Sequence, residues 1–334
     1  MNWSSVKNLL IAILVAANLF LIFNIVRQDR TRGYISDGEL RDAIELLGER
    51  GFSVLEAAVP TKRFKAPVYE SQYDDEYYTE VATTLSGSER EMLYTMPNGG
   101  ISISTKNGIW LEFDNGFDFR YSKFDISNSA AYTEITADTF ANAAAAGSVL
   151  TASRMKSISS AVSDFLCRLQ PKDSPLSAKT VGAFTDSSGR TFVLAEQYLD
   201  GYKVYSHYAV CVFEDTKLIF AHGRWYFSDI GKSYSTELCD QVNILFTDMT
   251  FLKSNVANAM LENGGENADS SSSLTDSESE NIVLPSVSSV TACYAAYWNS
   301  DKTALYFIPA WQIDHIDSLT IVYNAANATV YSSN

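Results

Sequence analysis

Histidine, cysteine and positive charge are scarce in this chain. Its 334 residues include three histidines and four cysteines, and 25 Lys and Arg face 40 Asp and Glu for a formal net charge of −15. Phosphate backbones repel such an acidic chain, which argues against nucleic-acid binding. The cysteines are too few and too scattered for a disulfide scaffold and form no C-x-x-C pair. We expect buried thiols, with one disulfide in an oxidising exterior as the alternative.

The sequence patterns that carry chemistry are also missing. No H-x-x-x-H or H-E-x-x-H pattern joins His207, His222 and His315, and there is no G-x-S-x-G elbow or phosphate-cradling glycine loop. Acidic clusters at 74–76 and 114–118 lack the alternating spacing of calcium ligands and stand beside turn signals. We therefore predict no catalytic residue, no metal ligand and no cofactor, and we expect that the protein is not an enzyme.

One long apolar run is present near the start of the chain. Residues 9–26 read LLIAILVAANLFLIFNIV and contain no charge. A helix of this length covers about 27 Å, close to the ~30 Å hydrocarbon core of a bilayer. The run exceeds the apolar region of a cleaved signal peptide, and no small-x-small cleavage site follows it. We predict a tail over 1–8, an uncleaved transmembrane helix over 9–26 and a juxtamembrane linker over 27–35.

Charge alone leaves the orientation of this anchor open. Three arginines follow the apolar run closely, whereas one lysine precedes it. By the positive-inside rule this favours a cytoplasmic body, but long domains cross the membrane largely regardless of charge.

Two asparagines interrupt the anchor. An amide in mid-membrane is costly without a partner and can hydrogen-bond across a helix interface, for ~0.6–2 kcal/mol. The alternative is an asparagine that faces lipid. We take the interface as the prediction, because small Ala17 beside Asn18 permits close helix approach. The candidate partner-binding residues on or beside this face are Leu14, Ala17, Asn18, Leu21, Asn24 and Ile25.

Residues 36–125 are predicted to form a first α+β domain. Ser36-Asp37-Gly38-Glu39 is a capping-box pattern that begins a helix over 37–50. Asn-Gly turns then separate short apolar or aromatic runs, which is typical of an antiparallel meander. The strands expected here are 52–59, 68–69, 77–85, 92–96, 101–105, 109–113 and 117–124.

Residues 136–334 are predicted to form a second α+β domain that repeats the order of helix and then meander. Helices are expected over 136–147, along the apolar face from Met155 to Leu169, and over 248–262. The acidic, serine-rich segment 263–281 is predicted to be a flexible loop. The expected strands are 180–184, 191–199, 202–213, 217–227, 286–298, 304–314, 319–324 and 329–331. The fold class is thus α+β, with antiparallel sheets each packed against a helix.

Two aromatic segments stand out, Trp225-Tyr226-Phe227 and Ile308-Pro309-Ala310-Trp311. Core packing is the favoured interpretation of both. A partner surface is the alternative, because exposed aromatic residues are frequent in binding hot spots.

Sparse matches over nearly the whole chain resemble the YycI (YycH/YycI) family. They are the opening Met1-Asn2-Trp3-Ser4 with Lys7 and the anchor, the segments 195–198 and 201–205, and the closing segments 305–313 and 322–325. The closing part is also similar to PepSY-like modules. Two features depart from the family: 324–328 has Asn327 where a glycine is expected, and 263–281 looks like an insertion.

The resemblance implies a location and partners. Members of this family are bitopic proteins of the Gram-positive cell membrane, with the N-terminus in the cytoplasm and the body outside. They modulate the sensor histidine kinase WalK (YycG), which governs cell-wall metabolism, together with a sister protein, YycH. We therefore expect a non-enzymatic regulator that acts by protein contacts, the transmembrane helix included. The alternative is an extracellular PepSY-like module that binds a peptide, a wall fragment or a protease.

Overall fold

The computed structural model describes residues 34–72, 77–96, 100–114, 117–123, 130–263, 284–299, 301 and 304–333. The predicted tail, transmembrane helix and linker lie outside the described residues, as does the predicted acidic loop beyond Asn263. Within the described part, no helix is both long enough and apolar enough to cross a membrane.

The described chain divides into two compact units, and the division differs from the expected domains 36–125 and 136–334. Unit 1 contains the described residues of Met1–Ala66, Glu237–Ala292 and Ala310–Asn334. Unit 2 contains those of Pro67–Thr236 and Cys293–Pro309. The difference arises because segments from both ends of the chain join one sheet, a pairing that local sequence patterns do not reveal.

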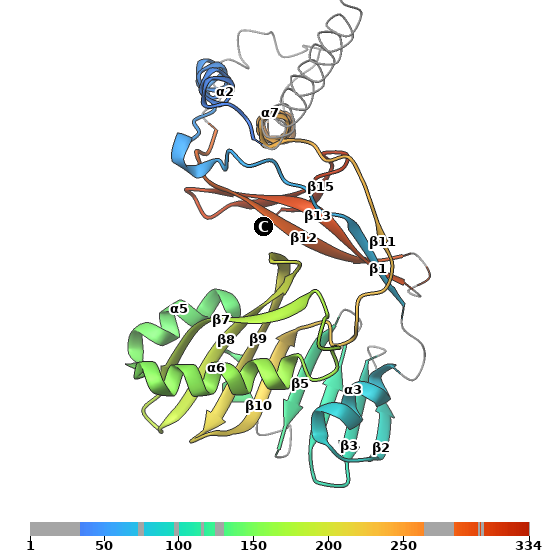
Figure 1. The fold of residues 1–334 in the computed structure, drawn as a ribbon. Coiled ribbons are helices and arrows are strands. Elements are labelled where there is room, and N and C mark those ends of the chain that lie inside the picture. Colours follow the sequence, from blue (N-terminus) through green and yellow to red (C-terminus); the bar gives the residue numbers. More distant parts are fainter. Residues whose placement is uncertain are drawn as a thin grey trace, which may run out of the picture. The chain divides into compact units, whose positions relative to one another are not determined.

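Unit 1 is built on the closing strands of the chain. Strand β13 (Ala304–His315) pairs antiparallel with β14 (Thr320–Asn324), which pairs with β15 (Val330–Ser333). Its helices are α2 (Asp37–Glu49), the short 3₁₀ helix η1 (Glu56–Ala58) and α7 (Gln241–Asn263). Helices α2 and α7 lie on the same side of these strands (Figure 1). Strand β12 (Val287–Trp298), like β13, contributes residues to both units.

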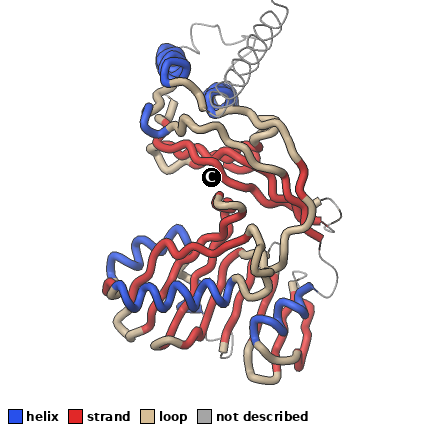
Figure 2. Tube along the Cα trace, in the orientation of Figure 1, coloured by secondary structure: helices blue, strands red, loops and turns tan. Residues whose placement is uncertain are grey.

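Unit 2 has a long antiparallel sheet in the order β7-β8-β9-β10-β5-β4-β3-β2. Figure 2 shows these strands with helices packed along them. The strands are β1 Val68–Gln72, β2 Arg90–Thr95, β3 Ile101–Thr105, β4 Trp110–Phe113, β5 Asp118–Ser122, β6 Ser148–Val149, β7 Leu176–Thr185, β8 Arg190–Leu199, β9 Tyr202–Glu214, β10 Lys217–Arg224 and β11 Ser233–Tyr234. The helices are α3 Tyr77–Ser86, α4 Ala130–Thr133, α5 Ala137–Ala146 and α6 Ala152–Leu166.

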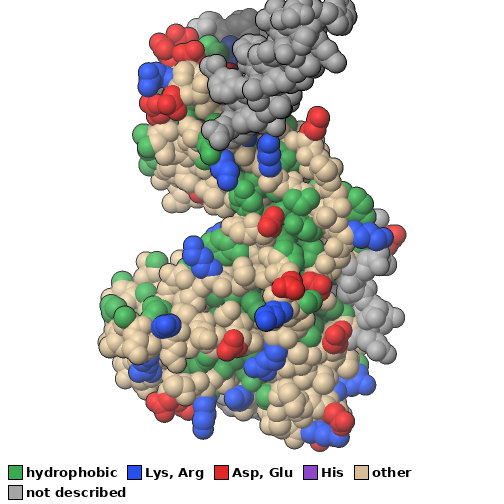
Figure 3. Space-filling model, in the orientation of Figure 1, with side chains coloured by type: hydrophobic (Ala, Val, Ile, Leu, Met, Phe, Trp, Pro, Cys, Tyr) green, Lys and Arg blue, Asp and Glu red, His purple; other side chains and the backbone are tan. Residues whose placement is uncertain are grey.

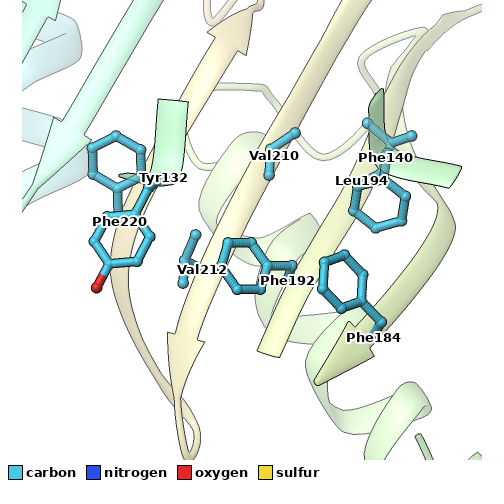
Figure 4. Packing of buried hydrophobic residues seen from close by; sticks show 8 residues of the cluster. All are labelled: Tyr132, Phe140, Phe184, Phe192, Leu194, Val210, Val212 and Phe220. Atoms are coloured by element: carbon cyan, nitrogen blue, oxygen red, sulfur yellow. The ribbon is translucent and has the colours of Figure 1, made fainter. Parts of the chain in front are cut away.

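Aromatic side chains fill the core on one face of this sheet, beneath α4 and α5. Phe184 and Phe192 stack at 5.1 Å between ring centroids, and Phe140 of α5 meets Phe184 edge-on at 5.3 Å. Figure 4 shows the complete cluster, which is Tyr132, Phe140, Phe184, Phe192, Leu194, Val210, Val212 and Phe220. Burial of each large side chain contributes about 1.5–3 kcal/mol, so this cluster is a major source of stability.

Several sequence predictions are confirmed. Helix α2 begins at a complete capping box, in which Ser36 Oγ accepts from the Glu39 amide and Glu39 accepts from the Ser36 amide. Helix α5 begins at Ala137 and has Thr136 as its N-cap, where a helix over 136–147 is predicted. The α+β class is confirmed, but the sheet is mixed rather than purely antiparallel, because β12 pairs parallel with β9 at Tyr294 and Val204.

Two predicted strands are wrong. Residues 77–85 form helix α3, because Tyr77, Val81 and Leu85 recur at helical spacing and all three are buried; their aromatic and β-branched character suggested a strand instead. Residues 52–59 contain one bridge residue and η1 rather than a strand.

The first predicted helix also has a different partner from the one expected. Helix α2 belongs to unit 1 and packs on α7, whereas α3 packs beside the meander of β2 to β5. The last four strands predicted there, 92–96, 101–105, 109–113 and 117–124, correspond to the antiparallel meander β2-β3-β4-β5, whereas 68–69 belongs to β1, which pairs with β13 and β11 instead.

Candidate functional site

The six candidate partner-binding residues of the anchor, Leu14, Ala17, Asn18, Leu21, Asn24 and Ile25, lie outside the described residues. The site is therefore built from the two units, taken separately.

Both aromatic segments are core, as the favoured interpretation predicts. Trp225, Tyr226 and Phe227 are each at most 1% exposed. Trp311 is fully buried, its Nε1 donates to Cys239 O at 3.0 Å, and its ring meets Phe64 edge-on at 5.4 Å. These rings are not accessible to a partner.

A buried amide holds His207 in one tautomer. Gln197 Nε2 donates to Tyr226 O at 2.7 Å, and Gln197 Oε1 accepts from Tyr226 N at 3.2 Å, which fixes the orientation of the amide. His207 Nδ1 lies 2.8 Å from the same Oε1 and must therefore donate to it. Burial, aided by the Arg224 cation, lowers the pKa of His207 to about 3. His207 is thus a neutral structural donor at ordinary pH.

An irregular β9 turns His207 inward. The β8–β9 register shifts between Glu196, which faces Tyr208, and Tyr198, which faces Lys203. Within the extra residues Ser206 has φ +59°, a conformation that costs free energy outside glycine. The resemblance included 195–198, but a bulge of this kind leaves no distinctive residue pattern.

A second strained residue packs nearby in unit 2. Phe117 has φ +66° and is buried, and its ring stacks on Trp298 at 4.6 Å and meets Tyr226 edge-on at 5.4 Å. Aromatic packing on two sides stabilises a backbone conformation that is unfavourable for a bulky residue.

Unit 1 contains a fully buried ion pair. His315 Nε2 lies 3.0 Å from Asp248 Oδ2, and both side chains are inaccessible to solvent. Tyr323 O–H donates to Asp248 Oδ1 at 2.6 Å, while His315 Nδ1 faces Leu319 O at 3.1 Å. Because a carbonyl and a carboxylate are both acceptors, each ring nitrogen donates. Burial opposes the imidazolium, but the hydrogen bond and charge of Asp248 outweigh it and raise the pKa of His315.

Rows of alternating charge lie beside the aromatic cluster on the same face of the unit 2 sheet, where His222 contacts Phe220 of the cluster. Arg120 pairs with Glu112 at 2.9 Å, and Arg224 pairs with Asp118 through two contacts of 3.0 and 3.1 Å. His222 sits opposite Arg120 in the β-ladder, and burial, with the Arg120 cation acting in the same direction, lowers its pKa to about 4. A hollow of about 560 Å³ opens here, and its lining includes Glu112, Asp114, Asp118, Arg120 and His222. Two of these carboxylates, Glu112 and Asp118, are paired with arginines.

Metal ligation finds no support among the described residues. No group of three or more His, Cys, Asp or Glu there is arranged to hold a metal ion. None of the four cysteines, all of which the structure describes, forms a disulfide: Cys211 and Cys293 are buried, and Cys167 and Cys239 are half-buried. The alternative of one disulfide is therefore wrong in this structure.

The edge strand β2 is the most exposed apolar element of unit 2. It lies at the end of the sheet (Figure 1), and in the part of the chain that the structure describes it pairs with β3 alone. All six of its residues are exposed. Met92, Leu93 and Tyr94 follow one another and are 44–47% exposed. An unpaired edge with apolar side chains on both faces can accept another strand.

Comparisons with known proteins add no functional assignment. No family model matches the chain, and no curated protein matches it. Among solved structures, an uncharacterized protein from Eubacterium rectale is similar to this chain, with 10% sequence identity and a TM-score of 0.45 over 84% of this chain and 89% of the other.

Proposed function

We propose that this protein is a non-enzymatic, membrane-anchored extracellular regulator of a two-component sensor histidine kinase that controls cell-wall metabolism. It acts by protein–protein contacts, and the transmembrane helix provides some of them. The sequence resemblance to the YycI family supports the class of partner. The exposed edge strand β2 is the structural observation that supports a contact with another protein.

Strand β2 has the two properties that strand addition requires. Its outer backbone N–H and C=O groups are unpaired within the described chain, so an added strand gains main-chain hydrogen bonds. Met92, Leu93 and Tyr94 offer apolar area on both faces, and an exposed apolar edge invites aggregation unless a partner covers it. The partner in this proposal is an extended segment of the kinase's external region.

The anchor adds a second contact in the bilayer. Asn18 pairs through its amide with a polar group of a kinase helix, and Ala17 allows the two backbones to approach. A YycH-like sister protein is the third member of the assembly. Two weak contacts on one chain reinforce each other, because the first raises the effective concentration of the second.

Co-purification of the kinase with the full-length protein from membranes tests the proposal. Leu93→Asp places a charge in the added-strand interface and should reduce recovery of the kinase several-fold. Val149→Asp is the matched control, because Val149 is 93% exposed in the short strand β6 of the same unit. Asn18→Leu should also reduce recovery while leaving membrane insertion intact.

Equal recovery of the kinase with Leu93→Asp and with Val149→Asp would rule out the β2 contact. Unchanged recovery with Asn18→Leu would rule out the anchor contact. If the body from Gly33 onward captured its target as well as the full chain does, the PepSY-like binding module would be the better description.

A further inference from the structure

A groove of about 700 Å³ opens on the face of the unit 2 sheet that α3 and α6 cover. Its walls are the end of α3 at Leu85 and Ser86, the end of α6 at Phe165, and Arg168 just beyond that helix. Strands β5, β9 and β10 supply its floor. Figure 3 shows basic and acidic side chains intermixed on this face. The volume is within the usual range of ligand sites, about 300–1,000 Å³.

The side chain of Tyr121 lines this groove. Tyr121 is 3% exposed, and within the described part of the chain its hydroxyl makes no hydrogen bond, while its ring meets Phe165 edge-on at 5.0 Å. Burial raises the pKa of Tyr121 to about 12, so the hydroxyl keeps its proton and can donate. The hydroxyl is not among the solvent-inaccessible side-chain oxygens of the described chain that lack a partner, so it reaches the groove and is available to donate to a ligand group.

Two cations stand at the mouth of the groove. Arg168 Nη1 donates to Leu85 O at 2.8 Å, and its guanidinium lies 5.9 Å from the Phe165 ring centroid, which holds it at the α6 wall. Lys123 follows β5 directly and is exposed. Asp164 is the one carboxylate among the lining residues. The chain as a whole has a net charge of −15, but this groove has two cationic side chains and one carboxylate, so it favours an anion.

We propose that this groove binds the C-terminal end of a short apolar peptide. Tyr121 and Lys123 donate to the terminal carboxylate, and the Arg168 guanidinium adds its charge. Phe213 and Leu218 contact the apolar side chains of the peptide, while Asp164 and Thr216 accept hydrogen bonds from its N–H groups. A fatty acid would leave those two polar groups without a role, so we commit to a peptide. No residue of β2 lines the groove, and the site does not depend on the kinase contact.

The probe is N-acetyl-Ala-Leu-Phe with a free carboxylate, titrated by calorimetry into the full-length protein in nanodiscs. Its carboxamide twin is the ligand control. The acid should bind saturably and at least about tenfold more tightly than the amide, because charged hydrogen bonds are the stronger ones. Tyr121→Phe and Lys123→Gln should each weaken the acid about fivefold or more, whereas Lys156→Gln, an exposed lysine of α6 outside the groove, should not.

Several results would overturn the proposal. One is the absence of saturable binding of the acid up to about 5 mM, a concentration at which even very weak complexes form. Another is equal affinity of the wild type for the acid and the amide. A third is equal affinity of the wild type and Lys123→Gln for the acid. Tighter binding of decanoate than of the peptide would assign the groove to lipid instead. Lys123 is exposed, so its variant keeps the test valid even if Tyr121→Phe perturbs folding. The two proposals can fail independently. If the peptide binds but the kinase is not recovered, only the regulatory proposal fails. If the kinase is recovered but the peptide does not bind, only the groove proposal fails.

Discussion

Asp248 and His315 form an ion pair between helix α7 and the end of strand β13, with 3.0 Å between Oδ2 and Nε2 and no solvent access to either side chain. The two residues are 67 positions apart in the sequence. Removal of one partner from a buried pair leaves the other charge uncompensated, which makes this contact a sensitive probe of unit 1.

The stability of unit 1 should weaken as the solution becomes alkaline. The folded pKa of His315 is raised above the unfolded value of about 6.5, so its contribution is complete below that value and is lost as the pH rises through the folded pKa. The difference in free energy of unfolding between wild type and His315→Gln, measured in urea, should shrink with rising pH. A difference that grows with pH would contradict the ion pair.

Removal of one hydroxyl from the same network should also be costly. Tyr323→Phe deletes the 2.6 Å bond to Asp248 and should destabilise the protein by about 1–3 kcal/mol, the usual cost of an unsatisfied buried group. Tyr94→Phe, at an exposed hydroxyl, is the control and should change stability little. Equal effects in urea denaturation would mean that the Tyr323 hydroxyl is not part of a stabilising network.

Unit 2 should respond to pH in the opposite direction. The pKa of His207 in the folded protein is about 3. Below pH 6.5 this histidine is therefore protonated in the unfolded chain but stays neutral in the folded protein. From neutrality to pH 5, this single group should lower the free energy of unfolding by about 2 kcal/mol. Titration of the His207 ring by NMR should show no protonation down to about pH 4, and a midpoint near 6.5 would refute the Gln197 arrangement.

Substitution by alanine at two glycines should change the stability of the protein in opposite directions. Gly223 has φ +144°, and a Cβ there would lie 2.1 Å from Tyr208 O, so Gly223→Ala should cost several kcal/mol. Gly38 in α2 has no atom within 4 Å of such a Cβ, and Gly38→Ala should stabilise by about 0.5–1 kcal/mol. Thermal unfolding of both variants measures the contrast, and similar shifts would exclude the close approach of β10 to β9.

Local patterns in the sequence predict much of the fold, whereas long-range assembly escapes them. The capping box at Ser36 and Glu39 predicts the start of α2 because its two hydrogen bonds are local. The assignment of α2 to unit 1 depends on its contact with α7, about two hundred residues later, and no local signal encodes that. Helix α3 is not predictable in the same way, because Tyr77 and Val81 suit both a strand and a buried helix face.

The candidate site shows the same limit. Residues 92–96 were predicted as a strand, but only the sheet order reveals that β2 is an edge with its apolar side chains exposed. Tyr121 lay within a predicted strand too, and its unpaired hydroxyl is apparent only once α3 and α6 are placed over β5. The sequence pattern predicts that a segment forms a strand, but the order of the strands in the sheet determines which edges and faces remain exposed.

Site-specific photo-crosslinking in living cells tests the regulatory function most directly. A photoreactive amino acid at position 93 or 18 of the full-length protein should give an adduct with the sensor kinase, while the same group at position 149 should not. An adduct of equal yield at 93 and 149, or no kinase adduct at either 93 or 18, would contradict the proposed contact between this protein and a sensor kinase.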